Sequence, residues 1–234
     1  MPIAELSAKI CPLCQEPHIG FFSVCYICTE AQEAQRQEQA KREAHIAKGV
    51  EWKEMCPPIY RTSDWGRTDI ATECANVAQT WWAKDDGKGL GIYGGSGLGK
   101  TRAMWEILKR HHFAGRKVKA IDAIGLENAA GDRHYSDRRE SLSARHSIQQ
   151  CKHVGILYID DLGKERASPA VAKVLHDIIE HRTRNRLTTL WTSEKVGAEL
   201  GARLGDDYAD GLIRRLREFS TIIQANPQSK NPIP

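Results

Sequence analysis

Residues 91–102 read GIYGGSGLGKTR, and four of the six positions from Gly94 to Gly99 are glycine. Glycine loses more backbone entropy on folding than any other residue, so such a cluster indicates a backbone that turns sharply or closely approaches a ligand. A short apolar run, Leu90–Tyr93, precedes the cluster, and apolar residues at helical spacing follow it over Lys100–Phe113. The segment predicts a strand, a tight glycine loop and a helix, in that order.

The spacing Gly94-x-x-x-x-Gly99-Lys100-Thr101 between a strand and a helix matches the phosphate loop, or Walker A pattern. In such a loop, backbone N–H groups and the helix N-terminus surround the β- and γ-phosphates, the lysine bridges their oxygens, and the threonine hydroxyl binds Mg²⁺. The alternative is a glycine-rich turn with a chance lysine. The predicted nucleotide-binding residues are Gly94, Gly95, Ser96, Gly97, Leu98, Gly99, Lys100, Thr101 and Arg102.

Two aspartates, Asp160 and Asp161, end the continuous apolar run Val154–Ile159, which is typical of a buried parallel strand. We expect Asp160 to hold Mg²⁺ through its water shell and Asp161 to position or activate the attacking water. Many such ATPases have glutamate at the second position, and aspartate is one methylene shorter. Slow or partner-dependent hydrolysis is therefore expected, while an acidic turn is the alternative.

Strand and helix patterns alternate from about Pro57 onward, which predicts a parallel α/β sheet flanked by helices. Ser168 and Pro169 form a helix start ahead of an apolar helical face. The other expected elements are strands at Val118–Ile121, Thr188–Thr192 and Thr221–Ile223 and helices at Ser141–Lys152 and Leu212–Phe219.

Four cysteines near the N-terminus form two CxxC pairs in CPLCQEPHIGFFSVCYIC: Cys11, Cys14, Cys25 and Cys28. Two such turns complete a tetrahedral Zn²⁺ site, and the metal would supply the folding free energy of so small a segment. His18 is a competing ligand, and chance pairing or redox chemistry are the alternatives. The isolated Cys56, Cys74 and Cys151 are interpreted as packing or surface thiols.

Phe21, Phe22 and Tyr26 lie within or beside this cysteine module. Three interpretations stay open: a stacking surface for single-stranded DNA, an apolar patch for a partner protein, or packing within the module itself. We expect a zinc module at 1–28, a charged helical linker at 29–56, a nucleotide-binding domain at 57–225 and a flexible tail at 226–234.

The net charge of +4 permits nucleic-acid binding without requiring it. No apolar run is long enough to span a bilayer and no signal-peptide core is present, so a cytoplasmic, non-membrane protein is expected. Structural disulfides are rare in that reducing compartment, which favours metal ligation by the paired cysteines.

The segments GIYGGSGLGKT, ILYIDDLGKE, IIEHRTRNRLTTLWTSE and GLIRRLREFSTII resemble, in order and spacing, bacterial AAA+ helicase-loader ATPases of the DnaC/DnaI type, relatives of the IstB-like ATP-binding proteins. CPPIYR resembles the lead-in of the same group. The resemblance covers Pro57–Ile223 and implies an AAA+ domain without a C-terminal helical lid. The small size of the chain, and the glutamate at position 194 where such loaders carry asparagine, suggest a phage or prophage version.

The resemblance also implies roles for three further residues. Thr192 and Ser193 fall at the sensor-1 position, where a polar side chain contacts the γ-phosphate. Glu194 replaces the usual asparagine there and would repel a triphosphate, so either Thr192 or Ser193 does the sensing or the sensor is weak. Arg215 falls at the arginine-finger position, which implies self-association through the ATP sites. Alternatively, Arg215 and its neighbouring arginines form a solvated basic face.

The segment between the second and third strands of the domain faces the DNA path in such loaders. We expect Arg138, Arg139 and Arg145 to bind phosphates there, with Arg133, Lys152 and Tyr135 nearby. Acidic residues are interspersed, so a solvated loop is the alternative.

Taken with the resemblance, these features predict an ATP-, Mg²⁺- and Zn²⁺-binding ATPase. It would bind the replicative DNA helicase and help deposit it on single-stranded DNA. The alternatives are an IstB-like ATPase acting with a transposase, and a zinc adaptor that uses ATP as a structural switch.

Overall fold

The computed structural model describes residues 8–19, 22–62, 70–131, 138–164, 167–205 and 208–229. Internal contacts divide the chain into two units, Met1–Glu51 and Trp52–Pro234, and the division falls within one long helix, α1 (Tyr26–Met55). No helix in the described ranges has the length and apolarity that a membrane crossing requires.

The first unit contains a small hairpin and most of α1. Strands β1 (Ala8–Ile10) and β2 (Pro17–Ile19) pair antiparallel, with Lys9 opposite His18. Helix-favouring residues dominate α1. Glu38 and Arg42 form an ion pair one helical turn apart, with 3.3 Å between Arg42 Nε and Glu38 Oε1, but both side chains are exposed and the pair contributes little stability.

The second unit is built on a five-stranded parallel sheet with strand order β4-β5-β6-β3-β7. The strand that precedes the glycine loop, β3, is therefore separated by one strand, β6, from the strand that ends in the paired aspartates, β5. The bounds are β3 (Gly89–Tyr93), β4 (Val118–Asp122), β5 (Ile156–Asp160), β6 (Thr188–Ser193) and β7 (Ser220–Gln224).

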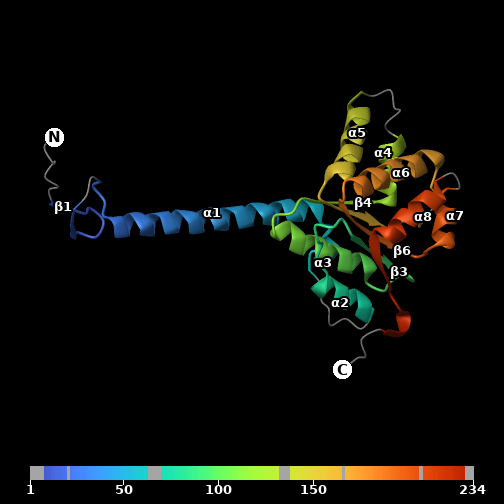
Figure 1. Ribbon diagram of the computed structural model, residues 1–234, viewed down its shortest axis with the longest axis horizontal. Coiled ribbons are helices and arrows are strands. Elements are labelled where there is room, and N and C mark those ends of the chain that lie inside the picture. Colours follow the sequence, from blue (N-terminus) through green and yellow to red (C-terminus); the bar gives the residue numbers. More distant parts are fainter. Residues whose placement is uncertain are drawn as a thin grey trace. The chain divides into compact units, whose positions relative to one another are not determined.

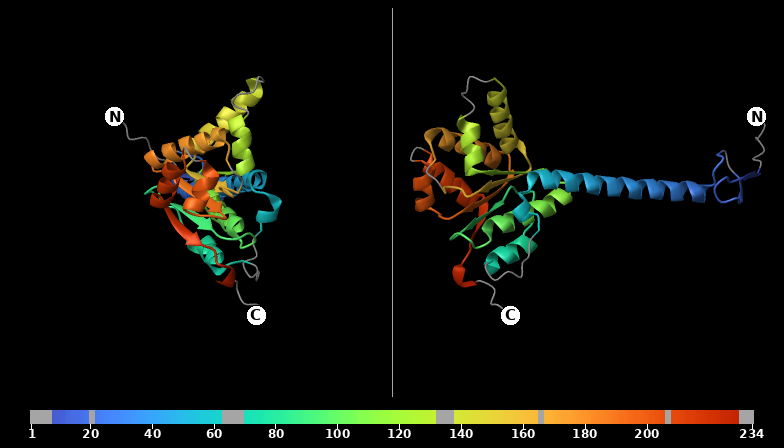
Figure 2. Two further views of the ribbon diagram at one scale, coloured as in Figure 1. Left: turned by 90° about the vertical axis from the view of Figure 1, so that its right-hand side faces the viewer. Right: turned by 180° about the vertical axis from the view of Figure 1, so that it is seen from behind.

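Helices cover both faces of this sheet (Figure 1). One face packs against α2 (Thr72–Thr80) and α3 (Lys100–Phe113), with the short 3-10 helix Pro58–Tyr60 beside α3. The other face carries α4 (Ala123–Gly131), α5 (Arg138–His153), α6 (Pro169–Arg184), α7 (Ala198–Leu204) and α8 (Ala209–Glu218). Helices α4 and α5 lie side by side (Figure 2). The predicted parallel α/β fold is confirmed.

The two-residue period of β5 decides which of its side chains reach the nucleotide side of the sheet. Ile156 and Tyr158 belong to the apolar cluster under α2 and α3, while Leu157 and Ile159 belong to the cluster under α6. Side chains two residues apart on a strand point to the same face. Asp160 therefore shares the α3 face with Tyr158.

Local signals placed several helices correctly. Helix α3 begins at Lys100 and ends at Phe113 as predicted, and Ser168 caps α6 by accepting a hydrogen bond from the Val171 N–H at 3.4 Å. Cys56, Cys74 and Cys151 are all buried, as expected for packing thiols.

A buried arginine of α6, Arg182, donates hydrogen bonds to the end of α5, to the segment before β5 and to the first residues of β6. It is fully buried, and burial lowers the pKa of its guanidinium to about 9, so it is charged at neutral pH. Oxygen atoms of the chain surround this charge. The acceptors are Cys151 O at 2.8 Å, Val154 O at 2.8 Å, Thr188 O at 2.5 Å and Thr189 Oγ1 at 2.9 Å.

Candidate functional site

The glycine loop between β3 and α3 adopts a backbone that other residues rarely take. Gly94, Gly97 and Gly99 have φ values of +143°, +74° and +84°. A Cβ atom on Gly94 would lie 2.5 Å from the Ala225 carbonyl oxygen, and one on Gly99 would lie 2.9 Å from Ile70 Cγ2. Positive φ explains the glycines at 94, 97 and 99, and close packing adds a second reason at 94 and 99. Gly95, Ser96 and Gly97 are exposed.

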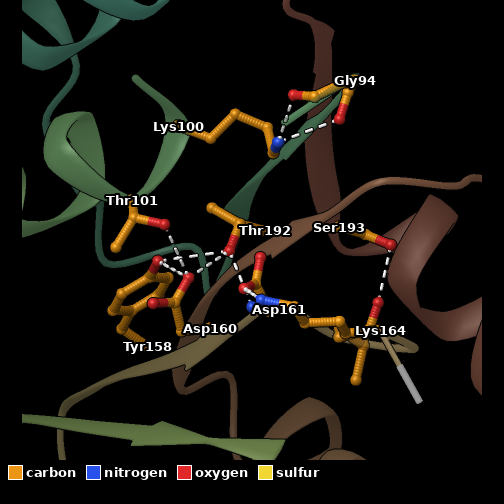
Figure 3. Close-up of polar contacts among 11 residues, drawn as sticks. Gly94, Lys100, Thr101, Tyr158, Asp160, Asp161, Lys164, Thr192 and Ser193 are labelled. Atoms are coloured by element: carbon orange, nitrogen blue, oxygen red, sulfur yellow. Dashed lines mark hydrogen bonds and ion pairs between the residues drawn. The ribbon is translucent and has the colours of Figure 1, made fainter. Parts of the chain in front are cut away.

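Lys100, the first residue of α3, directs its ammonium into this loop. The Nζ atom donates to the carbonyl oxygens of Gly94 at 2.9 Å and Gly95 at 2.7 Å (Figure 3). The side chain is buried, and this desolvation lowers the pKa of the ammonium, while the carboxylates of Asp161 and Glu194 oppose the shift. A buried cation inside a loop of backbone amides can bind an anion such as phosphate.

Three hydroxyl groups converge on one carboxylate oxygen, Asp160 Oδ1, at the end of β5 (Figure 3). Thr101 Oγ1 donates to it at 3.0 Å, Thr192 Oγ1 at 2.6 Å, and the Tyr158 hydroxyl also donates to it. The strand order explains the meeting, because β6, which carries Thr192, lies between β3 and β5. Thr101 and Asp160 thus present adjacent oxygen atoms, the donor type that Mg²⁺ prefers.

Asp161 lies one residue beyond the strand, with a φ of +52°. Its backbone N–H donates to Thr192 Oγ1 at 3.0 Å, and its Oδ2 atom lies 2.9 Å from Lys164 Nζ. The conformation turns the Asp161 side chain away from the pleat of β5 and places it beside Lys164. Sequence reasoning did not single out Lys164.

Thr192 and Ser193, the two candidate sensor residues, occupy opposite faces of β6. Thr192 lies on the face of Asp160, whereas the buried Ser193 donates to the Leu162 carbonyl oxygen at 2.6 Å. The structure therefore brings Thr192 and not the Ser193 hydroxyl to the carboxylate cluster. Glu194 follows and is exposed, and its carboxylate acts to raise the pKa of Lys100.

The Arg102 side chain contacts the segment before the domain's first helix. Its Nη1 atom donates to the Thr62 carbonyl oxygen at 3.0 Å, and its guanidinium carbon lies 5.7 Å from the centre of the Tyr60 ring. A cation at this distance over an aromatic ring is attracted by it.

Arg215 on α8 is held within its own chain. Its Nη2 atom forms an ion pair with Glu180 of α6, and its Nη1 atom donates to the Gly211 carbonyl oxygen at 3.2 Å. Its neighbours Arg214 and Arg217 are exposed and line a cleft of about 900 Å³ between α7 and α8. The environment of Arg215 therefore differs from that of its two neighbours.

The four paired cysteines meet in the first unit. The Sγ atoms of Cys11, Cys14, Cys25 and Cys28 all lie within 4.8 Å of one another, and those of Cys14 and Cys25 are 3.6 Å apart. A tetrahedral zinc site with Zn–S bonds of about 2.3 Å has S···S edges of about 3.8 Å. The donor set and its spacing fit zinc.

A hydrogen bond favours the thiolate form at one of the four cysteines, Cys11, whereas the pKa values of Cys14 and Cys28 are raised where the thiols lie together. The Cys25 N–H donates to Cys11 Sγ at 3.5 Å, and this bond is the main reason that the pKa of the Cys11 thiol is lowered to about 6. A lowered pKa favours the thiolate that a metal requires. His18, the competing ligand, instead contacts the Ser23 carbonyl oxygen through Nε2 at 3.2 Å.

Large apolar side chains on this unit are exposed rather than packed around the cysteines. Phe22 is 80% exposed and Tyr26 is 75% exposed, so neither forms the packing of its own module. Phe21 lies outside the described residues. The other large apolar side chains exposed on the module are Ile10, Leu13, Ile19 and Ile27.

The candidate DNA-contacting residues are only partly described. Arg139 and Arg145 are exposed on α5, and Arg138 begins that helix. Arg133 and Tyr135 lie outside the described residues. The described part is a helix with basic groups on its solvent face.

Several solved structures share this fold. A crystal structure of DnaI is 20% identical, with a TM-score of 0.53, over 68% of this chain and 80% of that one. A crystal structure of the DnaC helicase loader is 18% identical, with a TM-score of 0.53, over 75% of this chain and 99% of that one. The replication initiator DnaA bound to AMPPCP and single-stranded DNA is 14% identical, with a TM-score of 0.52, over 65% and 44%.

The second unit therefore shares the fold of the DnaI and DnaC structures, as the resemblance in sequence predicted. No protein-family model matches the sequence, and no curated protein matches it.

Proposed function

We propose that this protein is a Mg²⁺-dependent ATPase that binds the replicative DNA helicase and helps to place it on single-stranded DNA. The observation that carries the proposal is the meeting of Thr101 and Asp160 beneath the glycine loop that holds Lys100. A phosphate-binding loop, a buried cation and adjacent oxygen donors are the parts that phosphoryl transfer needs. The fold shared with DnaI and DnaC favours helicase loading among the uses of such a site.

Each residue of the site has a distinct task in this proposal. The amides of the loop and Lys100 hold the β- and γ-phosphates, while Thr101 and Asp160 hold Mg²⁺, which supplies charge neutralisation at the transferred phosphoryl group. Asp161 orients the attacking water, and its shorter side chain makes hydrolysis slow. Thr192 contacts both aspartates, because its hydroxyl donates to Asp160 Oδ1 and accepts from the Asp161 N–H. In this role it couples the presence of the γ-phosphate to the positions of the two carboxylates.

Arg215 is proposed to act on the nucleotide of a neighbouring subunit, where it would stabilise charge in the transition state. In this structure the Arg215 guanidinium is paired with Glu180 of α6. It would have to leave this carboxylate to reach the phosphate oxygens of a neighbouring subunit's nucleotide. Self-association through the ATP sites follows from this role, because the arginine of one subunit would serve the nucleotide of the next.

The cysteine module is proposed to hold structural zinc and to contact the helicase. Six large apolar side chains exposed on so short a segment favour a protein surface as their partner. Arg138, Arg139 and Arg145 on α5 are proposed to bind the phosphates of single-stranded DNA. We place this activity in the cytoplasm.

Affinity purification from the native cell, with ATP and without it, tests the proposal. We expect a ring helicase to be recovered in a nucleotide-dependent manner, and Lys100→Ala to abolish that dependence. Phe22→Ser with Tyr26→Ser should lose the helicase while ATP hydrolysis by the second unit persists. Recovery of a transposase would move the protein to IstB-like function, and turnover that no partner or DNA stimulates would favour the zinc adaptor.

The DNA contact has its own test. Replacing Arg139 and Arg145 with alanine should weaken binding to single-stranded DNA and flatten the salt dependence of the affinity. Unchanged affinity and slope would contradict the assignment of α5.

A further inference from the structure

A buried tyrosine hydroxyl on the α3 face of the sheet contacts Asp160, one of the proposed magnesium ligands. Tyr158 is fully buried in β5, and its hydroxyl donates to Asp160 Oδ1 and lies 3.2 Å from Thr192 Oγ1 (Figure 3). Tyr158 and Asp160 are two residues apart on one strand, so both project toward α3. The sequence shows this only as a tyrosine within an apolar run.

Packing fixes where the hydroxyl points. The Tyr158 ring meets Trp105 of α3 edge to face, with 6.1 Å between centroids and 87° between planes, a favoured aromatic geometry. Leu90, Ile156 and Leu190 of the sheet belong to the same buried cluster. A ring held on all sides by close-packed neighbours has one orientation, and here that orientation aims the hydroxyl at the carboxylate.

An apolar side chain would fill this position at lower cost. A buried hydroxyl must keep a hydrogen-bond partner, since leaving it unpaired costs about 1–3 kcal/mol. A bound substrate cannot contact Tyr158, because the side chain is fully buried in the core. The hydroxyl can therefore act on the site only through Asp160 and Thr192.

We propose that Tyr158 is a positioning residue, which pins Asp160 Oδ1 so that the carboxylate and the Thr101 hydroxyl face one magnesium ion. With one oxygen held by the three hydroxyls, the carboxylate keeps a single rotamer and its other oxygen serves the water shell of the metal. Groups that orient metal ligands tune metal affinity even though they never touch the metal. This inference rests on the proposed function, which makes Thr101 and Asp160 the magnesium ligands.

The test is Tyr158→Phe, which keeps the ring and removes the hydroxyl. We measure ATP binding in EDTA, ATP binding and turnover across a Mg²⁺ titration, and thermal unfolding. The ATP affinity in EDTA should equal that of wild type, and the unfolding temperature should match wild type within a few degrees. The Mg²⁺ concentration for half-maximal binding and turnover should rise about tenfold, the lower end of the range for partners of metal ligands.

Tyr60→Phe is the matched control, because Tyr60 also contacts Trp105, here in a stacked geometry with 6.3 Å between centroids, but lies outside the sheet. It should leave the Mg²⁺ dependence unchanged. Thr192→Val is a second variant, which removes another donor to Asp160 Oδ1 and should shift the Mg²⁺ dependence in the same direction.

A Mg²⁺ dependence of Tyr158→Phe equal to wild type would overturn the positioning role and leave the ATPase proposal intact. Equal losses of ATP binding with and without Mg²⁺ would also overturn it, since they would indicate a purely structural tyrosine. Wild-type ATP binding and turnover that ignore Mg²⁺ would instead refute the proposed magnesium site itself.

Discussion

The Lys164 ammonium lies 2.9 Å from Asp161 Oδ2, three residues earlier in the loop after β5. The hydrogen bond to Asp161 raises the pKa of Lys164, so its ammonium keeps its charge at physiological pH. One oxygen of the carboxylate proposed to orient the attacking water is thus occupied by a cation of its own loop. Both side chains are partly exposed, so the contact is weak enough to exchange.

Lys164→Met should raise the basal rate of ATP hydrolysis. An exposed ion pair contributes up to about 1 kcal/mol, so release of Asp161 is expected to give an increase of about fivefold or less. Steady-state turnover at saturating ATP and Mg²⁺ measures it. Lys195→Met, which removes the exposed pair with Glu199, is the control. A fall in turnover would show that Lys164 assists catalysis instead of restraining Asp161.

ATP affinity should decline in the alkaline range at a lower pH than an ordinary lysine would dictate. Burial lowers the pKa of Lys100, so its ammonium loses its proton earlier as pH rises, and the loop then loses the charge that attracts phosphate. Bound phosphate favours the protonated form, so ATP binding takes up a proton in this range. Calorimetric titrations in buffers of different ionisation enthalpy measure both effects.

Lys100→Arg is the control for this pH dependence, because a guanidinium keeps its charge throughout the range. Its affinity should be lower than that of wild type and nearly independent of pH. Parallel pH profiles for the two proteins would contradict the assignment of the effect to Lys100.

Arg215→Ala should retain ATP binding and lose the stimulation of turnover that assembly provides, a loss on the order of a thousandfold where a finger is fully engaged. Asp161→Asn should lose hydrolysis in its own site but still supply its arginine. Mixing the two inactive variants should therefore restore turnover, measured against protein concentration.

Arg214→Ala and Arg217→Ala are the controls for the finger, since both side chains are exposed beside the α7–α8 cleft. Loss of stimulation in Arg214→Ala or Arg217→Ala that mixing with Asp161→Asn restores, together with stimulation that persists in Arg215→Ala, would move the finger to the corresponding neighbour.

Removing the metal should unfold the cysteine module and leave the second unit intact. Cys14→Ser removes one of the four thiolates and a strong chelator competes for the metal, so either should abolish bound zinc, measured by elemental analysis. The module then unfolds, because the hairpin has too small a core to fold alone. All six tryptophans lie at position 52 or later, so their fluorescence reports the second unit and should not change. Zinc content equal to wild type in Cys14→Ser would refute the four-cysteine site, and Cys56→Ala is the control that should retain zinc.

Arg182→Met should destabilise the second unit by about 3 kcal/mol or more, because several buried carbonyl groups would lose their donor together. Urea unfolding followed by tryptophan fluorescence measures the change. Arg184→Met, which removes an exposed arginine paired with Glu180 on the same helix, should cost less than about 1 kcal/mol. Similar losses for both variants would contradict the structural role of Arg182.

Prediction from sequence succeeded where local chemistry decides the structure. The glycine spacing, the apolar run before Asp160 and the cap at Ser168 each act within a few residues, and β3, β5, α3 and α6 are present where expected. Helices α2, α4 and α7 were not predicted. Each has nine residues or fewer, and most of its stability comes from packing, which local propensity does not report.

The amino-acid sequence by itself determined the chemical parts of this protein: an amide-lined loop with a lysine, oxygen donors at strand ends and four thiols at metal-binding spacing. Only the tertiary structure decided which parts meet. The strand order places Thr192 between the loop and Asp160, the pleat of β5 turns Tyr158 toward the same carboxylate, and the loop after β5 brings Lys164 to Asp161. Thr192 and Asp160 are distant in sequence and meet because their strands pair, which is a property of the whole folded chain. The other two contacts lie within three residues, and the backbone of β5 and of the loop after it sets their direction.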